Sequence, residues 1–247
     1  MDILFLLFLI LSLIAEILGT IGGFGSSVFF VPFANLFIDF KSVLGVTAIF
    51  HLSSNISKLY LFREGLNKQL LVQIGIPAVV FVIIGGFLSK YVDEVILQIS
   101  FSIFIIITSL FFLIFKHFVV SPNKRNAMIG GTLSGFLAGV LGTGGAIRGI
   151  TMVAFNIEKS TFVATSAAID FAVDFSRTIV YIYNGYIQQA HAKYIVGLLI
   201  IGFVGSWLGK RLLQTIPQKK FRMVVLLMLL AVGLFSLVNT INNHSSI

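Results

Sequence analysis

The chain has 247 residues, of which 57% are hydrophobic and only 11% are charged, and its mean hydropathy is +1.04. A soluble domain carries about 25% charged residues, so most of the apolar surface of this chain must face lipid rather than water. The net charge of +8 comes largely from Lys and Arg in short gaps between apolar runs, with no basic run interleaved with aromatic residues, so we expect no nucleic-acid partner.

The first apolar run starts directly after Met1 and Asp2. A secretory signal peptide has a positively charged start and a small-residue cleavage site, and neither is convincing in this sequence. We therefore expect residues 3–18 to be retained as part of the membrane domain. The chain has no Cys, which excludes disulfides and thiolate metal sites.

Six apolar runs are long enough to cross a bilayer as helices, at residues 43–62, 70–88, 95–115, 161–183, 192–213 and 223–238. Two further regions, 3–38 and 128–157, are too long for one spanning helix and too short for two. Each contains a cluster of glycines, at 19–25 and at 139–145. Glycine costs about 1 kcal/mol in a helix interior, so we expect helix breaks there, with the second helix of each region starting at Ser26 and Ala146.

The two glycine clusters lie 120 positions apart, and other short pieces recur at nearly the same offset. Lys41-Ser42 returns as Lys159-Ser160, Gly65 returns as Gly185, and the segment 85–90 returns as 205–210. The sequence therefore predicts two homologous membrane repeats, residues 1–115 and 127–247, joined by a polar linker at 116–126. Together they would form about eight to ten membrane segments.

The distribution of positive charge indicates how the repeats are oriented. If each broken region returns to the face from which it started, eleven loop cations lie on one side of the membrane and three on the other. If each broken region crosses once, the split is eight to six. Cytoplasmic loops are enriched in Lys and Arg, so the uneven split is favoured. The larger group comprises Arg63, Lys68, Lys116, Lys124, Arg125, Lys159, Lys210, Arg211, Lys219, Lys220 and Arg222, and the smaller group Lys41, Lys90 and Lys193.

The predicted fold class is therefore an all-α polytopic membrane protein with two inverted repeats. Each repeat would be a Gly-broken helical hairpin followed by three transmembrane helices. We expect a multi-pass protein of the cell membrane with both termini outside the cytoplasm.

Paired Gly-interrupted segments in two inverted halves are typical of transporter binding sites. A helix that restarts in mid-membrane presents free N–H groups and the positive end of its dipole, which favours an anion. The alternative is that the glycines serve only close helix packing. The candidate anion-binding residues at the breaks are Gly22, Gly25, Ser26, Gly142, Thr143 and Gly145.

Polar residues also recur at helical spacing in the span after each break, and the two sets superpose at an offset of 119. A charged residue in mid-span costs around 2.5–3.5 kcal/mol on insertion scales, so such residues are functional candidates. Two alternatives remain open: Asp174 and Arg177 pair only with each other, and Lys58 reaches up to the membrane surface. The first set is Thr47, His51, Asn55 and Lys58, and the second is Ser166, Asp170, Asp174 and Arg177.

Arg148 follows the second break and Glu16 precedes the first, so three intramembrane cations balance three acids. A bound anion then requires a carboxylate to take up a proton, or a geometry that keeps an acid apart from the cations. We interpret Arg148, Arg177 and Ser166 as anion ligands. His51, Asp170 and Asp174 are the candidates for coupling to protons, and Glu16, Asn55 and Lys58 are secondary candidates. No spacing indicates a metal site, a cofactor or a nucleophile–base set.

The sequence resembles those of the TauE/SafE family of sulfite and organosulfur-anion exporters. The resemblance rests on Gly22-Gly23-Phe24-Gly25 with Pro32 downstream, on the second box at residues 142–145, and on Thr165-Ser166, and it extends over essentially the whole chain. Phe24 interrupts the first box, Ala146 replaces a further glycine, and the second half lacks the proline. The resemblance implies transport of a small sulfur-containing anion, from sulfite to sulfonates.

The expected function is a secondary transporter, without cofactor, that exports a small anion and whose other partner is the lipid bilayer. One alternative is a non-transporting membrane scaffold or channel subunit. The other is an integral-membrane enzyme that uses Asp170 and Asp174.

Overall fold

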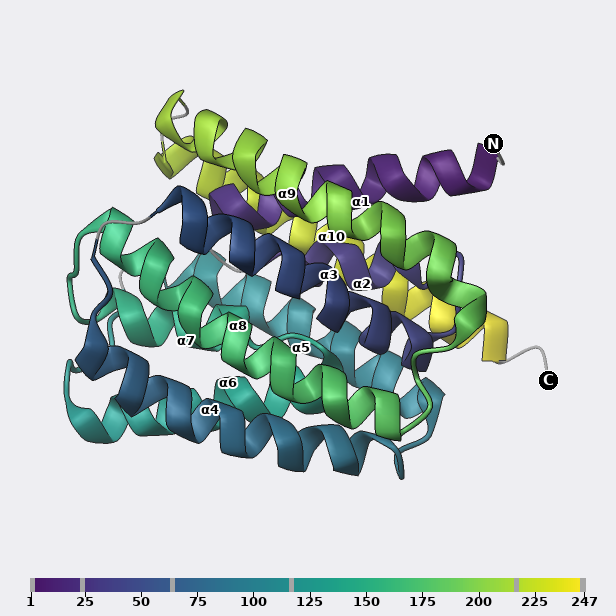
Figure 1. Cartoon of the computed structure of the whole chain (residues 1–247), viewed down its shortest axis with the longest axis horizontal. Helices are drawn as coiled ribbons and strands as arrows, with labels where there is room; N and C mark the ends of the chain where they lie inside the picture. The colour runs from purple at the N-terminus through teal and green to yellow at the C-terminus, as the bar shows by residue number, and fades with distance from the viewer. Residues whose placement is uncertain (1–2, 23–24, 63–64, 116–117, 216–217, 245–247) are drawn as a thin grey trace.

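The computed structural model describes residues 3–22, 25–62, 65–115, 118–215 and 218–244 (Figure 1). Within these ranges the protein consists of helices and contains no strand, which confirms the predicted fold class at the level of an all-helical protein. Arg63 and Lys116, two of the predicted loop cations, and Gly23 and Phe24 of the first glycine box lie outside the described residues. The helices are α1 (Ile3–Gly22), α2 (Ser27–Ala34), α3 (Phe40–Leu61), α4 (Lys68–Ser89), α5 (Glu94–Ile114), α6 (Lys124–Leu141), α7 (Gly145–Val153), α8 (Lys159–Tyr183), a short 3-10 helix (Gln189–His191), α9 (Ala192–Thr215) and α10 (Gln218–His244).

Each of the six predicted spans coincides with a long helix, and α1 is a further long apolar helix. Five helices in the described part, α1, α4, α5, α9 and α10, are long and apolar enough to cross a membrane. The other two long helices, α3 and α8, are those that carry the two polar sets. Side-chain caps set several helix starts; for example, the Asp39 carboxylate accepts a hydrogen bond from the N–H of Ser42 at 2.9 Å.

The two glycine-rich regions are each a long helix followed by a short one, α1 with α2 and α6 with α7. Gly142 has φ of 75°, a left-handed conformation that terminates α6 and that favours glycine. The second helices begin at Ser27 and Gly145, within one residue of the predicted starts. Asn123 caps α6, so the last residues of the predicted polar linker 116–126 are already helical.

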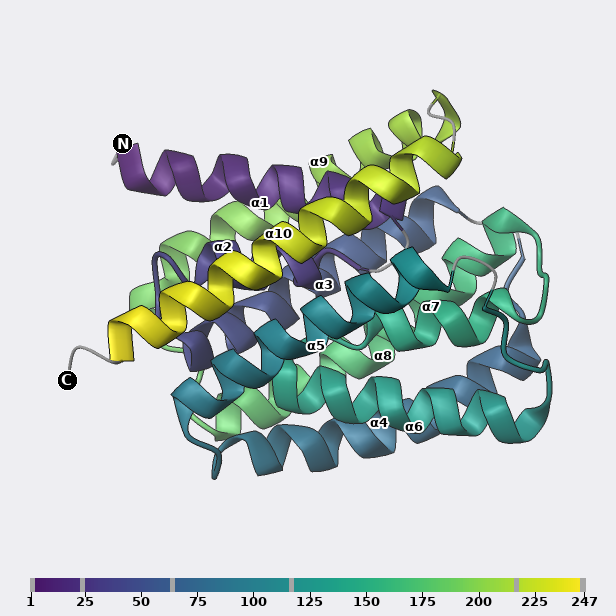
Figure 2. The same ribbon diagram turned by 180° about the vertical axis from the view of Figure 1, so that it is seen from behind.

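The helix contacts of one half have counterparts in the other (Figures 1 and 2). Helix α1 packs against α9, and its equivalent α6 packs against α4. Likewise α3 packs against α9 and α8 against α4, while the pairs α3–α8 and α5–α10 each join equivalent helices. Gly65 and Gly185 occupy equivalent turns with φ of 82° and 79°. The two halves therefore share one helix order and one set of packing partners.

Helices α3 and α8 run antiparallel through the centre of the molecule. Gly45, near the start of α3, lies against Tyr186, just beyond the end of α8. At the opposite end, the N–H of Asn67 donates to the Thr165 hydroxyl at 3.0 Å. Equivalent helices that point in opposite directions are what the inverted arrangement predicts.

Contacts at the two ends of the molecule also agree with the predicted grouping of the loop cations. Lys41 donates to the backbone carbonyl of Lys90, and both belong to the smaller group. Lys210 donates at 2.6 Å to the carbonyl of Leu61, at the end of α3 that leads to Lys68. The assignment of either end to the cytoplasm remains a prediction.

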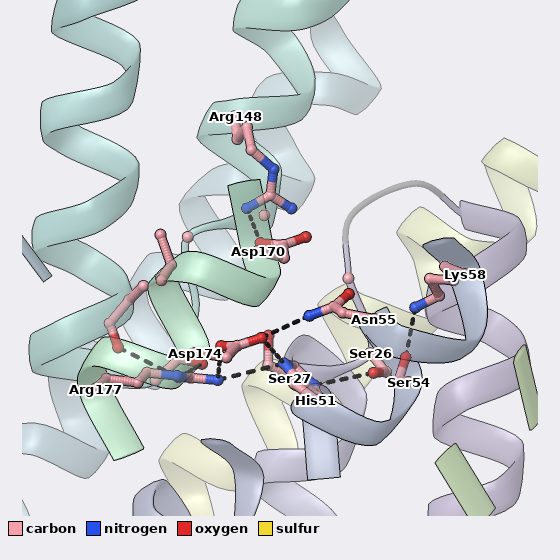
Figure 3. A pocket seen from close by; sticks show the side chains of 16 residues that line it. Ser26, Ser27, His51, Ser54, Asn55, Lys58, Arg148, Asp170, Asp174 and Arg177 are labelled. Carbon is pink, nitrogen blue, oxygen red and sulfur yellow. Dashed lines mark hydrogen bonds and ion pairs between the residues drawn. The ribbon is translucent and has the colours of Figure 1, made fainter. Parts of the chain in front are cut away.

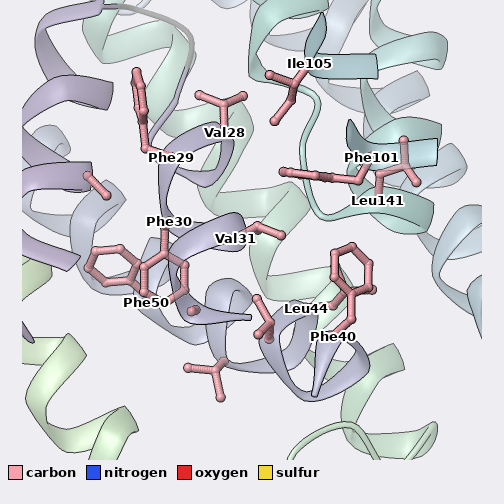
Figure 4. Packing of buried hydrophobic residues seen from close by; sticks show 14 of the residues in the cluster. Val28, Phe29, Phe30, Val31, Phe40, Leu44, Phe50, Phe101, Ile105 and Leu141 are labelled. Atoms are coloured by element: carbon pink, nitrogen blue, oxygen red, sulfur yellow. The ribbon is translucent and has the colours of Figure 1, made fainter. Parts of the chain in front are cut away.

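Helix α2 is short and lies almost wholly inside the protein. Its Phe29, Phe30 and Val31 are fully buried, and the Phe30 ring packs against the Phe50 ring of α3 with centroids 4.8 Å apart (Figure 4). Because burial of large apolar side chains contributes about 1.5–3 kcal/mol each, this packing fixes α2 firmly. The start of α2 is thereby held at the centre of the molecule.

Glycines make α4 and α6 an unusually close pair. A Cβ atom on Gly131, Gly135 or Gly139 of α6 would lie 2.4, 2.1 or 2.3 Å from a backbone carbonyl oxygen of α4. These three glycines, spaced by four residues, form one face of α6. Close packing is thus the role of this part of the glycine-rich region, as the alternative interpretation of the glycines supposed.

Candidate functional site

A pocket lies where the two helix breaks meet the polar faces of α3 and α8 (Figure 3). Its empty volume is about 400 Å³, which includes open solvent. Residues from both halves line it, and most of them are polar or glycine. The lining residues are Gly25, Ser26, Ser27, His51, Ser54, Asn55, Lys58, Ala138, Gly142, Gly144, Gly145, Arg148, Asp170, Val173, Asp174 and Arg177.

The three intramembrane cations form three separate ion pairs with the three acids. Lys58 Nζ lies 2.9 Å from Glu16 Oε1, and Arg177 Nη2 lies 2.8 Å from Asp174 Oδ1. The third pair joins Arg148 Nη1 to Asp170 Oδ1. Lys58 is thus held inside the protein, and the alternative in which it reaches up to the membrane surface is wrong. Because the charges balance in pairs, the site without ligand has no surplus of positive charge when all six groups are ionised.

The three pairs differ in how firmly the acid is held. Glu16 is fully buried and accepts hydrogen bonds from the hydroxyls of Thr20, Ser26, Ser54 and Ser206 in addition to Lys58. Asp174 is 4% exposed and is bound by Asn55 as well as Arg177. Asp170 is 23% exposed. Asp170 is therefore the most exposed of the three acids.

Arg177 also fastens α8 to the end of α6. Its Nη1 donates at 2.9 Å to the carbonyl of Gly142 and at 3.4 Å to that of Ala138, while its Nε has no partner. The last carbonyls of a helix lack intrahelical donors and form the negative end of the dipole. Arg177 therefore stabilises the break after α6 in addition to lining the pocket.

A continuous hydrogen-bonded chain runs from Arg177 to Glu16. Ser26 donates to Glu16 Oε2 at 2.5 Å, so its oxygen accepts from His51 Nε2, which lies 3.0 Å away. That leaves His51 Nδ1 without a hydrogen, and it accepts from Arg177 Nη2 at 3.3 Å. The contacts thus select the Nε2–H tautomer of a neutral His51. This chain joins α1, α2, α3 and α8.

The two polar sets identified in the sequence face each other across α3 and α8. Asn55 Nδ2 donates to Asp174 Oδ2 at 2.7 Å, and these two residues are equivalents at the offset of 119. Thr47 lies on the same helix as Asn55, but its hydroxyl donates to the Val43 carbonyl of its own helix.

The helix breaks meet at the pocket. The Ser27 hydroxyl at the start of α2 donates to the Thr143 hydroxyl between α6 and α7 at 3.0 Å. Gly144 and Gly145 start α7 at the pocket wall, and the N–H groups of the first turn of a helix have no intrahelical acceptor. The arrangement combines cationic side chains, hydroxyls and a helix start, which together can bind a small anion.

Most residues proposed from the sequence lie together at this site. Gly25, Ser26, Gly142, Gly145, Arg148 and Arg177 line the pocket, as do His51, Asp170, Asp174, Asn55 and Lys58. Three described residues do not line it: Glu16 lies behind Lys58, Ser166 accepts from Arg148 Nε at 3.1 Å, and Thr143 bonds to Ser27. Gly22 is the last residue of α1.

Two residues of the site were not predicted from the sequence: Ser54 and Ser206, which both donate to Glu16. Ser54 lies on the polar face of α3, three residues after His51, so its helical spacing could have identified it. Ser206 could be found only from the packing of α9 against α1 and α3. No cluster of three metal-binding side chains occurs among the residues that the structure describes.

Comparison with known proteins identifies the family of the chain. The sequence profile of the sulfite exporter TauE/SafE family matches residues 8–236. The chain is also 27% identical to a protein of Methanocaldococcus jannaschii that bears the name "Probable membrane transporter protein", over 94% of each chain. No solved structure is a significant match. With a profile match over nearly its whole length and a polar pocket between paired helix breaks, the chain belongs to the sulfite exporter TauE/SafE family of membrane transporters.

Proposed function

We propose that this protein is a secondary transporter that exports a small sulfur-containing anion, sulfite or a sulfonate, across the cell membrane. One observation carries the proposal: Lys58, Arg148 and Arg177 converge on a single pocket formed by both halves at their helix breaks. Intramembrane cations are costly and mark substrate pathways in transporters. Family membership supports the transport function, and the anion and the direction are our proposals.

Arg148 is the principal anion ligand in this proposal. Its guanidinium is held from one side by the Ser166 hydroxyl and from another by Asp170, the most exposed of the three acids. Gly145 lies beside it, so the free N–H groups of the first turn of α7 complete a cradle for the oxygens of the anion. A planar guanidinium with several donors suits the oxygens of a sulfite or sulfonate group.

Arg177 contributes charge from deeper in the site. It is 1% exposed and already binds Asp174, His51 and two carbonyls of α6. We propose that its role for the anion is electrostatic, and that it also holds the second break in shape. Gly25, Ser26, Gly142 and the adjoining N–H groups would form the opposite wall.

Export agrees with the energetics of a bacterial or archaeal membrane. An inside-negative potential drives each unit negative charge outward with about 2.3 kcal/mol per 100 mV. The competing enzymatic use of Asp170 and Asp174 is not favoured, because each of these carboxylates binds an arginine. A scaffold would not need six ionisable groups paired around a pocket.

The test is anion flux in proteoliposomes under an imposed potential of either sign. Sulfite, thiosulfate, sulfoacetate and sulfate are compared with empty liposomes and with the variant Arg148→Gln. We expect flux of sulfite or sulfoacetate that reverses with the potential and that Arg148→Gln reduces at least tenfold. Absence of flux for every anion under both polarities would favour the scaffold.

A further inference from the structure

We infer, resting on the transport function proposed above, that Asp170 and the substrate anion compete for Arg148, so that the protein takes up one proton with each anion it binds. The protein would then carry one proton with each anion, so a divalent anion would move with one net negative charge and respond to the membrane potential, whereas a monovalent anion would move without net charge. Asp170 gives up its ion pair with Arg148 to the anion, whereas Glu16 and Asp174 keep their ion pairs with Lys58 and Arg177.

Charge balance leads to this inference. Three cations and three acids are already paired at the site, so an added monovalent anion leaves one negative charge without compensation. An uncompensated charge in a low-dielectric site costs several kcal/mol. Uptake of one proton by one of the three carboxylates removes that charge.

The structure distinguishes the three carboxylates as proton acceptors. Protonation of Glu16 would weaken its ion pair with a lysine and the hydrogen bonds that it accepts from four hydroxyls. Protonation of Asp174 would weaken its ion pair with Arg177 and its hydrogen bond from the Asn55 amide. Asp170 binds Arg148 and is the most exposed of the three. A solvent proton thus reaches Asp170 most directly and displaces the fewest hydrogen bonds there.

The step is a simple exchange at Arg148. A proton from the open side of the pocket adds to the Asp170 carboxylate, and its ion pair with Arg148 Nη1 breaks. The guanidinium keeps its hydrogen bond from Nε to Ser166, which holds it at the pocket wall while Nη1 donates to an oxygen of the anion. No bond to the anion is made or broken, and release reverses the exchange.

Other charged groups around Asp170 set the conditions for this exchange. Helix α7 presents Arg148, α3 presents Lys58 and His51, and α8 itself presents Asp174 and Arg177. Among the described lining residues, only Ala138 and Gly142 come from α6 and its end, and none comes from α4. His51 occupies the position in the first half that Asp170 occupies in the second, at the offset of 119, but it is held neutral by Ser26 and Arg177.

The experiment measures proton uptake on anion binding by calorimetry in buffers of different ionisation enthalpy. The probe is a monovalent sulfonate such as methanesulfonate, because its single charged group does not titrate near neutral pH, whereas sulfoacetate carries a second negative charge and sulfite carries its own proton there. We expect uptake of about one proton per sulfonate, with Kd rising about tenfold per pH unit once Asp170 is ionised in the free protein. The same ratio should appear as proton movement during flux into proteoliposomes.

Asp170→Asn is the decisive variant, because the amide is always neutral and leaves Arg148 free. It should bind the sulfonate with a Kd that no longer depends on pH and with no proton uptake. Asp93→Asn, which changes a helix cap outside the pocket, should keep the wild-type proton uptake and pH slope. Binding by the wild type without proton uptake, or a pH slope that survives in Asp170→Asn, would overturn the inference while leaving anion transport intact. Absence of any anion binding would instead overturn the proposed function.

Discussion

Asn55 and Asp174 are equivalent residues of the two halves, and their side chains are hydrogen bonded to each other at 2.7 Å. Equivalent residues that contact each other lie where the two halves of the protein meet. At that point the site is chemically asymmetric, since one half supplies an amide donor and the other a carboxylate acceptor. The pair holds α3 and α8 together at the pocket wall.

Replacing this amide should weaken the protein measurably. Leucine has nearly the shape of asparagine, but in Asn55→Leu the Asp174 carboxylate loses a hydrogen-bond donor. The free energy of unfolding should therefore fall by about 1–3 kcal/mol. Thermal unfolding in detergent measures the change. Gln73→Leu is the matched control, because the buried Gln73 Oε1 has no hydrogen-bond partner and its loss should be neutral or stabilising. Equal melting temperatures for Asn55→Leu and the wild type would contradict the importance of the pair.

Arg148→Gln and Arg177→Gln should both stop anion flux, but for different reasons. Arg177→Gln leaves Asp174 buried without its cation and frees two α6 carbonyls, so it should also destabilise the protein by roughly 3–5 kcal/mol. Arg148→Gln should cost less, because Asp170 is partly exposed and can take up a proton. Flux and thermal unfolding measured on both variants separate the two roles. Normal flux in Arg177→Gln would mean that Arg177 serves only as a partner of Asp174.

Gly145→Val should abolish flux while leaving membrane insertion intact. A branched side chain at the first residue of α7 would occupy the pocket wall and keep the anion from the free N–H groups. Gly75→Ala is the control, since its Cβ would meet Ile169 at an ordinary 3.6 Å and should stabilise α4 by about 0.5–1 kcal/mol without loss of flux. If Gly145→Val transports normally, the glycine serves packing only.

The orientation of the repeats can be tested with single cysteines, because the natural chain has none. Lys124→Cys should react with a membrane-impermeant thiol reagent from the cytoplasmic side only, and Asn243→Cys from the outside only, as the eleven-to-three charge distribution predicts. The unaltered chain should give no labelling. Reaction of both cysteines from the same side would rule out inverted repeats.

Helix positions and helix breaks could be read from the sequence because they depend on local properties. Apolar run length defines α4, α5, α9 and α10, and Gly142 ends α6 because a left-handed residue is needed there. Helical spacing also identified the polar faces of α3 and α8. These features involve residues at most a few positions apart, so tertiary packing does not alter them.

The partners of the charged residues could not be predicted, because they depend on how separate helices pack. Only the pair Asp174–Arg177, three residues apart on one helix, was visible as an alternative in the sequence. The ion pair Lys58–Glu16 joins residues 42 positions apart (58 − 16 = 42), and it forms because the fold brings α1 to α3. Thr143 was proposed as an anion ligand because it is a hydroxyl at the second break, and Ser166 because it belongs to the polar set of the following span. The structure gives them the neighbouring side chains Ser27 and Arg148 as partners instead.

The glycine face of α6 constrains how the protein can change shape. Gly131, Gly135 and Gly139 let backbone touch backbone along α4, with no side chain between the helices at these three positions. Sliding or tilting of one helix on the other would force main-chain atoms into collision, so α4 and α6 should move as one rigid body. Across α1 and α9 the glycines instead meet side chains, such as Gly205 against Glu16 and Gly209 against Thr20. Any movement that loads and releases a ligand should therefore displace α4 and α6 together relative to the rest of the protein.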